Sequence, residues 1–125
     1  MADYSTSRIE ELPELWDGFC RLVRKGLGIE SFGVNLMEIP PDYTTGPHDE
    51  SGSGQEELYA AMRGSGWVLV GPDDDSEEPL TLDGDTLVRV GPGERRRVRS
   101  GPDGLRVLIV GGSPGQPYSP MEWSS

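Results

Sequence analysis

The chain has 125 residues and a mass of 13.6 kDa, which is the size of one compact domain. Its 18 glycines and 11 prolines are roughly twice the average shares of about 7 % and 5 %, which argues against a helical bundle, a coiled coil or a doubly wound α/β sheet and leaves a turn-rich all-β domain or partial disorder. The 22 acidic residues against 11 basic ones give a formal net charge of −11, which disfavours binding to nucleic acid or to an anionic membrane.

Cysteine usage and apolar runs indicate the cellular setting. The chain has one cysteine, Cys20, which cannot form an intramolecular disulfide. Residues 1–30 contain no apolar run typical of a signal peptide, and the longest apolar stretch near the C-terminus, 107–110, is far shorter than the ~20 residues that span a bilayer. We therefore expect a cytoplasmic protein without a membrane-spanning segment.

The N-terminal segment, residues 1–30, has a helical pattern. Its apolar residues recur at the spacing of one helix face, namely Leu15, Trp16, Phe19, Leu22 and Val23. This spacing predicts a short amphipathic helix over 14–25, although Gly18 in its interior costs about 1 kcal/mol relative to alanine. Cys20 lies on the apolar stripe, which indicates a buried, unreactive thiol rather than a nucleophile.

From residue 32 onward the apolar period changes to two, the spacing of β-strands. Clusters of Gly, Pro or Asp bound each candidate strand, and a further extended piece is expected over 43–50. Short strands at such spacing predict an all-β sandwich or a barrel of antiparallel strands. The candidate strands are 32–39, 56–63, 66–70, 80–82, 86–90, 95–99 and 105–110.

Two irregular segments complete the chain. The acidic loop 71–78 contains consecutive aspartates at 73–75, which lack the alternating ligand spacing of an EF-hand, so we expect a solvated loop rather than a calcium site. Residues 113–125 are rich in Gly, Pro and Ser. Within this tail, Tyr118 and Trp123 indicate that it packs on the barrel formed by 31–112.

The first of two motifs lies between residues 42 and 64. Five residues separate Asp42 from His48, and Glu50 follows two positions later. Six residues separate Glu57 from Gly64. This order resembles the first motif of the cupin superfamily, in which a glycine precedes His-x-His, a glutamate and a second glycine. Here Asp42 stands at the first glycine and Glu50 at the second histidine, and the loop between Glu50 and Glu57 is longer than in the family.

The second cupin motif has its counterpart over residues 84–100. Gly84 opens the segment, and Gly91 stands where the family has the proline of its turn. Arg96 occupies the position of the family's histidine, and Ser100 that of its asparagine. The resemblance covers most of 32–112 and implies a double-stranded β-helix, the cupin jelly-roll barrel, with a short N-terminal helix. The segment 32–112 is also similar to small bacterial single-domain cupins.

The resemblance also implies where a metal would be held. Cupins bind divalent ions such as Mn, Fe, Ni or Zn through imidazole and carboxylate, and the ligands here would be His48, Glu50 and Glu57. Arg96 argues against a metal, since a guanidinium stays protonated and cannot ligate one. We expect it to pair with Glu57 or Glu50 in a metal-free interior. A slip of one residue would place Arg97 there instead.

These residues support two main hypotheses, and neither decides whether the protein is an enzyme. The first is a small-molecule-binding cupin without a cofactor, which takes a polar or anionic ligand in a barrel pocket lined by His48, Glu50, Glu57, Tyr59 and Arg96. The second is a metal-dependent isomerase, dioxygenase or decarboxylase of a small organic acid or sugar. A purely structural or regulatory module would instead have its barrel filled by side chains. Cupins of this size are commonly dimers, and covering the edge strands also favours a homodimer.

Overall fold

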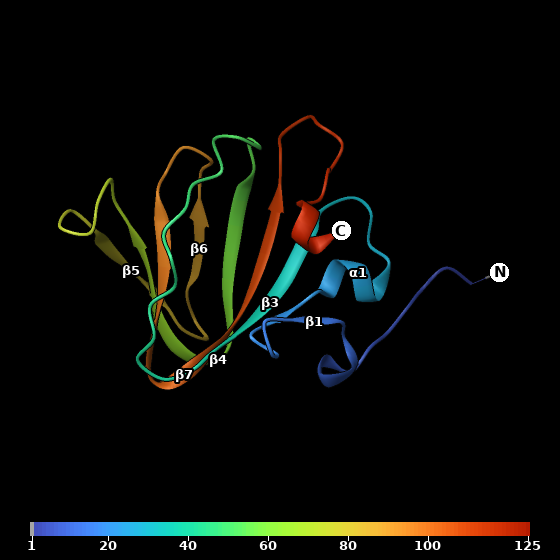
Figure 1. Ribbon diagram of the computed structural model, residues 1–125, viewed down its shortest axis with the longest axis horizontal. Helices are drawn as coiled ribbons and strands as arrows, with labels where there is room; N and C mark the ends of the chain where they lie inside the picture. The colour runs from blue at the N-terminus through green and yellow to red at the C-terminus, as the bar shows by residue number, and fades with distance from the viewer. Residues whose placement is uncertain (1) are drawn as a thin grey trace.

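One antiparallel sheet curls into a barrel in the computed structural model, which describes residues 2–125 (Figure 1). The sheet has the order β1-β2-β3-β7-β4-β5, and β6 pairs with β4 beside β5. Its strands are β1 (Glu14–Leu15), β2 (Cys20–Arg21), β3 (Gly33–Ile39), β4 (Glu56–Val70), β5 (Glu78–Leu82), β6 (Leu87–Val90) and β7 (Arg96–Gly112). The helices are α1 (Val23–Leu27) and the 3-10 turns η1 (Ile9–Glu11) and η2 (Glu122–Ser124).

The two long strands, β4 and β7, give the barrel its curvature. Their pairing shifts register between Ala61 and Arg63 and again between Gly64 and Gly66. Gly64 has a φ of 74°, and a Cβ there would collide with the carbonyl oxygen of Gly104 on the facing strand. The prediction of separate strands over 56–63 and 66–70 is therefore wrong, because a bulged bend joins them. The same correction applies to 95–99 and 105–110, which form β7.

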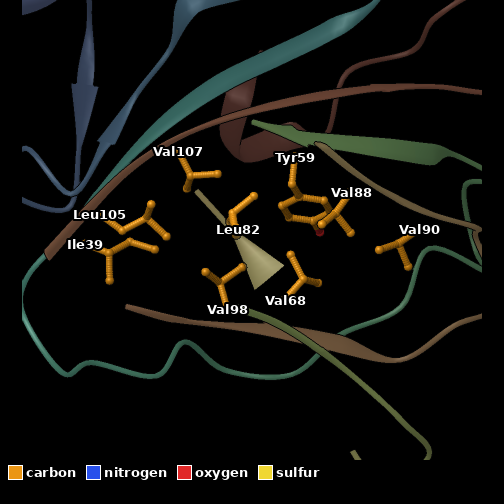
Figure 2. Close-up of a cluster of buried hydrophobic side chains, with 9 residues drawn as sticks. All are labelled: Ile39, Tyr59, Val68, Leu82, Val88, Val90, Val98, Leu105 and Val107. Carbon is orange, nitrogen blue, oxygen red and sulfur yellow. The ribbon is translucent and has the colours of Figure 1, made fainter. Parts of the chain in front are cut away.

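The core follows the period of two. In β6, Val88 and Val90 are buried whereas Leu87 and Arg89 are exposed. Nine buried side chains meet inside the barrel (Figure 2): Ile39, Tyr59, Val68, Leu82, Val88, Val90, Val98, Leu105 and Val107. Burying a side chain of this kind stabilises the fold by about 1.5–3 kcal/mol. The predicted all-β domain is confirmed, and the strands predicted over 32–39, 80–82 and 86–90 correspond to β3, β5 and β6.

The segment between β3 and β4 runs along the free edge of β7. Thr44 forms a β-bridge with Arg99, and His48 forms one with Arg96. The backbone of His48 both donates to and accepts from that of Arg96, at 3.0 and 2.9 Å. The predicted extended piece over 43–50 therefore places His48 beside Arg96 at the barrel wall.

The predicted helix over 14–25 is wrong for most of its length. Residues 14–21 form the β1–β2 hairpin, and the helix α1 has only five residues. Trp16, Asp17 and Gly18 have φ values of 54°, 58° and 87°, a left-handed turn that a helix cannot contain. The apolar stripe belongs instead to this hairpin, whose strand β2 pairs with β3 and extends the sheet.

The chain after β7 returns to these N-terminal elements, so that the C-terminus lies near α1 and β3 (Figure 1). Arg24 Nη2 donates a hydrogen bond of 2.9 Å to the carbonyl oxygen of Ser124, and its guanidinium lies 5.9 Å from the centre of the Tyr118 ring. The rings of Trp16 and Trp123 are 5.4 Å apart. These contacts place the tail against the β1–β2 hairpin and α1.

The acidic loop between β4 and β5 is only partly solvated. Asp73–Asp75 are exposed, as predicted, but the Glu77 side chain is 8 % exposed and binds two arginines. Arg97 donates to both Glu77 oxygens at 2.6 and 2.7 Å, and Arg95 donates at 3.2 Å. The loop is therefore tied to the outer face of β7. No helix within residues 2–125 has the length and apolar character that a membrane crossing requires.

Candidate functional site

A cavity of about 580 Å³ lies between the barrel interior and the terminal segments. Strands β3, β4 and β7 line it with Met37, Ile39, Tyr59 and Ile109, and the 45–50 segment adds polar groups. Its other side is aromatic and is formed by the β1–β2 hairpin and the C-terminal tail: Trp16, Phe19, Tyr118 and Trp123. Because a cavity opens beside the packed core, the structure departs from the filled barrel expected of a purely structural module.

His48, Glu50 and Glu57 meet in one wall of this cavity. His48 Nε2 lies 3.2 Å from Glu50 Oε2 and 3.8 Å from Glu57 Oε1. The His48 side chain is 47 % exposed, whereas those of Glu50 and Glu57 are 7 % and 14 % exposed. One ligand atom from each residue fits within 4.8 Å of the others, and residues 2–125 contain no other such group of three. We call these three residues the polar wall.

Local contacts fix the polar wall. The backbone of Glu50 donates to the carbonyl oxygen of Pro92 at 2.8 Å, and Ser53 Oγ donates to Glu50 Oε1 at 2.8 Å. Tyr59, two residues beyond Glu57 on the same face of β4, donates its hydroxyl proton to Glu57 Oε1 at 2.7 Å. Tyr59 is 1 % exposed and belongs both to the core and to the cavity lining.

Arg96 lies behind the polar wall and is fully buried. Its Nη2 donates to Glu57 Oε1 at 2.8 Å and its Nε to the Tyr59 hydroxyl at 3.3 Å. Its Nη1 donates to the carbonyl oxygens of Glu94 and Gly91 at 2.7 and 3.2 Å. The side chain thus folds back onto the 91–94 turn, where these acceptors satisfy a guanidinium that has no contact with water.

The expectation that Arg96 lines the pocket is therefore wrong. Its charge reaches the cavity only through Glu57 and Tyr59, because its own donors face the turn and the barrel wall. The alternative with Arg97 in this place does not hold either. Arg97 touches the cavity, but its guanidinium binds Glu77 on the outer face of β7.

The charges of the site are strongly coupled. The carboxylates of Glu50 and Glu57, 3.2 and 3.8 Å from Nε2, raise the pKa of His48 to about 9, so the imidazole is protonated at neutral pH. Burial raises the pKa of Glu57, but the nearby His48 and the hydrogen bonds from Tyr59 and Arg96 outweigh it and leave that pKa below its ordinary value. Burial, together with the neighbouring Glu57, raises the pKa of Tyr59. At neutral pH two cations, His48 and Arg96, therefore face two carboxylates.

The polar wall fits a divalent metal in donor type but not in charge. Imidazole nitrogen and carboxylate oxygen suit Mn, Fe, Ni or Zn. However, Glu57 Oε1 already accepts hydrogen bonds from Tyr59 and Arg96, and a metal ion held by Glu57 would lie close to the Arg96 cation. His48 would also have to lose the proton that it shares with Glu50 before it could ligate.

Comparisons with known proteins bear on the fold alone. No model of a protein family and no curated protein sequence matches the chain. Among solved structures, a cupin protein from Bacteroides fragilis is 15 % identical and aligns over 97 % of this chain and 93 % of its own, with a TM-score of 0.69. An RmlC-like cupin from Desulfovibrio desulfuricans is 15 % identical over 88 % of this chain and 97 % of its own, with a TM-score of 0.63. The chain has the cupin fold.

A third similar structure is a cupin enzyme with known metal centres. A variant of oxalate decarboxylase from Bacillus subtilis is 18 % identical over 75 % of this chain, with a TM-score of 0.61. Mn(II) centres have been described in that enzyme. The present chain spans only 25 % of its length, so the likeness shows the shared fold and not a shared reaction.

Sequence reasoning missed the aromatic side of the cavity. Trp16 and Phe19 were assigned to a helix, and the tail was expected only to pack on the barrel. The available signal was Asp17-Gly18 after Trp16, a turn-forming pair that leaves the indole at a hairpin tip. The convergence of the hairpin and the tail on one cavity is a tertiary feature that no local pattern encodes.

Proposed function

We propose that this cupin binds a small organic molecule in its cavity without a resident metal, and that the ligand's polar group contacts His48, Glu50 and Glu57. Arg96 carries the proposal. Its buried guanidinium binds Glu57 at 2.8 Å and stands at the position where the cupin motif has a histidine. A permanent protein cation thus balances the charge of Glu57, the role that a metal ion would otherwise have.

The cavity supports a binding function. Its volume of about 580 Å³ lies within the range of about 300–1,000 Å³ typical of small-molecule sites. Its lining is largely apolar, with a few polar groups converging from one side, as such sites require. None of the hydrogen bonds of Glu57 within residues 2–125 uses its second oxygen, Oε2, which leaves this acceptor for a ligand.

The charge of the cavity lining indicates which charge the ligand should carry. Three carboxylates line the cavity, those of Asp49, Glu50 and Glu57. The cations His48 and Arg96 offset two of them, and Arg97 is bound to Glu77, so the lining keeps one negative charge. The net charge of −11 adds a long-range field of the same sign. The sequence suggested a polar or anionic ligand, and the charge of the lining favours a neutral polar or cationic ligand over an anionic one.

The competing function is a metal-dependent enzyme, an isomerase, dioxygenase or decarboxylase, which the donor set of His48, Glu50 and Glu57 favours. The experiment is to purify the protein without chelator, measure its metal content, and record thermal unfolding with EDTA and with Mn²⁺, Fe²⁺, Ni²⁺ or Zn²⁺. We expect substoichiometric metal and an unchanged Tm in every case.

Two variants identify the origin of any metal response. A Tm increase that His48→Gln abolishes would overturn the metal-free proposal. An increase that persists in His48→Gln but is lost in an Asp73→Asn/Asp75→Asn variant would place the ion on the exposed acidic loop, and the proposal would stand.

A further inference from the structure

Resting on the proposed function, we propose that the ligand is an organic amine with a planar apolar body. Its ammonium group binds the carboxylates of the polar wall, and its body stacks on the aromatic mouth of the cavity, defined as Trp16, Phe19, Tyr118 and Trp123. The inference combines the position of these rings with the sign of the charge beside them.

The aromatic mouth is built for contact with a ligand. The rings of Trp16 and Trp123 lie 5.4 Å apart with an angle of 39° between their planes, and both line the cavity. Even so, Trp16 is 57 % exposed and Trp123 is 43 % exposed. Two large rings that pack together at a cavity and still expose this much surface offer aromatic faces to a ligand.

The backbone of Trp16 supports the same conclusion. Its φ of 54° lies in the left-handed region, which a bulky side chain rarely adopts. Such strain persists only where the surrounding structure imposes it, and it is concentrated at binding and catalytic sites. Here the hairpin turn holds the indole against Trp123 at the cavity.

The charge beside these rings selects a cation. Three carboxylates, those of Asp49, Glu50 and Glu57, line the cavity, and the guanidinium of Arg97 is turned away to Glu77. The His48 imidazolium and the buried Arg96 offset two of these charges, so one negative charge remains for a ligand. An ammonium group offers three N–H donors to acceptors of this kind, including Glu57 Oε2. Aromatic faces also attract cations through their quadrupole. Aromatic platforms with carboxylates also suit a neutral polyol, but only a cation gains from both the rings and the charge.

The test uses three indole derivatives with different side-chain charge: tryptamine, a cation; tryptophol, which is neutral; and indolepropionate, an anion. Isothermal titration calorimetry at neutral pH measures their affinities, and a methyl glycoside represents the polyol. We expect tryptamine to bind about tenfold or more tightly than tryptophol, since a charge-assisted hydrogen bond is worth at least that factor. We expect indolepropionate and the glycoside not to bind.

Variants locate the site. Trp16→Leu and Trp123→Leu should each weaken tryptamine binding at least about fivefold, as expected for the loss of one aromatic face over a cation. Glu50→Gln should reduce the preference for tryptamine over tryptophol. Trp67→Leu is the matched control, because Trp67 is a comparably exposed tryptophan on β4 that does not line the cavity. Its variant should bind as the parent does, and circular dichroism checks the fold of each variant.

Failure of this inference is distinguishable from failure of the proposed function. Equal binding of the three indoles, tighter binding of the anion, binding of the glycoside alone, or no tryptamine binding at millimolar concentration would each overturn the amine assignment. So would tryptamine binding that Trp16→Leu and Trp123→Leu leave unchanged. The proposed function fails on a different observation, a metal-dependent rise in Tm that requires His48.

Discussion

Arg96 Nη2 donates a hydrogen bond of 2.8 Å to Glu57 Oε1 inside the barrel, and no part of the arginine side chain contacts water. Removing two charges from water is costly, and a buried pair is sustained only if its remaining donors and acceptors are satisfied. Gly91, Glu94 and Tyr59 provide those partners for the guanidinium. The pair is therefore a fixed part of the barrel interior, and we expect its loss to lower the stability of the whole domain.

Replacement of Arg96 by methionine tests this relationship. We expect Arg96→Met to lower the free energy of unfolding by about 3–5 kcal/mol, because it leaves the Glu57 carboxylate buried without its cation. Urea denaturation followed by circular dichroism measures the loss. The double variant Arg96→Met/Glu57→Gln should recover part of this lost stability. It also provides the measurement if Arg96→Met alone does not fold.

The matched control for that experiment is Arg89→Met. Arg89 pairs with Glu56 on the outer face of the sheet, where their side chains are 67 % and 42 % exposed. Surface pairs contribute less than about 1 kcal/mol, so this variant should remain near the stability of the parent. Equal losses for Arg96→Met and Arg89→Met would contradict a special role for the buried pair.

His48 should titrate well above its ordinary range. It is the single histidine of the chain, so its NMR signal is unambiguous, and the neighbouring carboxylates of Glu50 and Glu57 raise its pKa to about 9. Because the folded pKa exceeds the ordinary value of 6.5, the stabilisation is complete below about pH 6.5 and is lost as pH rises through about 9. Solvent screening keeps this contribution small, since the ring is half exposed.

Two measurements check this titration. An NMR pH titration should give a midpoint near 9 in the parent and a value closer to 6.5 in a Glu50→Gln/Glu57→Gln variant. The unfolding free energy of His48→Gln should lack the decline between those two pH values. A parent midpoint at the ordinary value would show that the polar wall does not hold the imidazolium.

The sequence predicted the parts of the molecule that follow a local period. Alternation identified β3 and β6, and the resemblance to the cupin motifs placed Glu57 and Arg96 on neighbouring inner surfaces, where they pair. The prediction of a helix over 14–25 failed, because a stripe of apolar residues is compatible both with a helix and with a hairpin that pairs with a distant strand. That Arg96 lies behind the cavity surface depends on the carbonyls of the 91–94 turn, which no side-chain pattern reveals.

Gly64 should be the least replaceable glycine of the β4 bend. Gly64→Ala introduces a methyl group that collides with the backbone of Gly104, at a φ of 74° that alanine adopts with strain. We expect a loss of about 2 kcal/mol or more in unfolding free energy. Gly84→Ala is the control, since a Cβ at Gly84 meets nothing within 4 Å. Equal stability of both variants in urea would show that the bend is not constrained at Gly64.

Cys20 should be unreactive in the folded protein. It is completely buried, and burial raises the pKa of its thiol to about 11, so almost no thiolate exists at neutral pH. A thiol reagent such as dithionitrobenzoate should modify it only at the rate at which the domain unfolds. Rapid, stoichiometric reaction under native conditions would contradict the buried position.

The homodimer stays a prediction, and the outer face of the sheet gives it a test. Leu87 on β6 is 70 % exposed, and Leu58 on the neighbouring β4 is 38 % exposed. Light scattering after size-exclusion chromatography should show a dimer that Leu87→Lys weakens. A parent protein that elutes as a monomer at all concentrations would contradict the prediction.

The most direct test of the metal-free polar wall is anomalous diffraction from crystals grown with excess Mn²⁺, recorded at the manganese edge. We predict no anomalous peak within bonding distance of His48 Nε2, and an Arg96 guanidinium that still donates to Glu57. A peak bound by His48, Glu50 and Glu57, with Arg96 displaced from Glu57, would contradict the proposal that a protein cation takes the place of the metal.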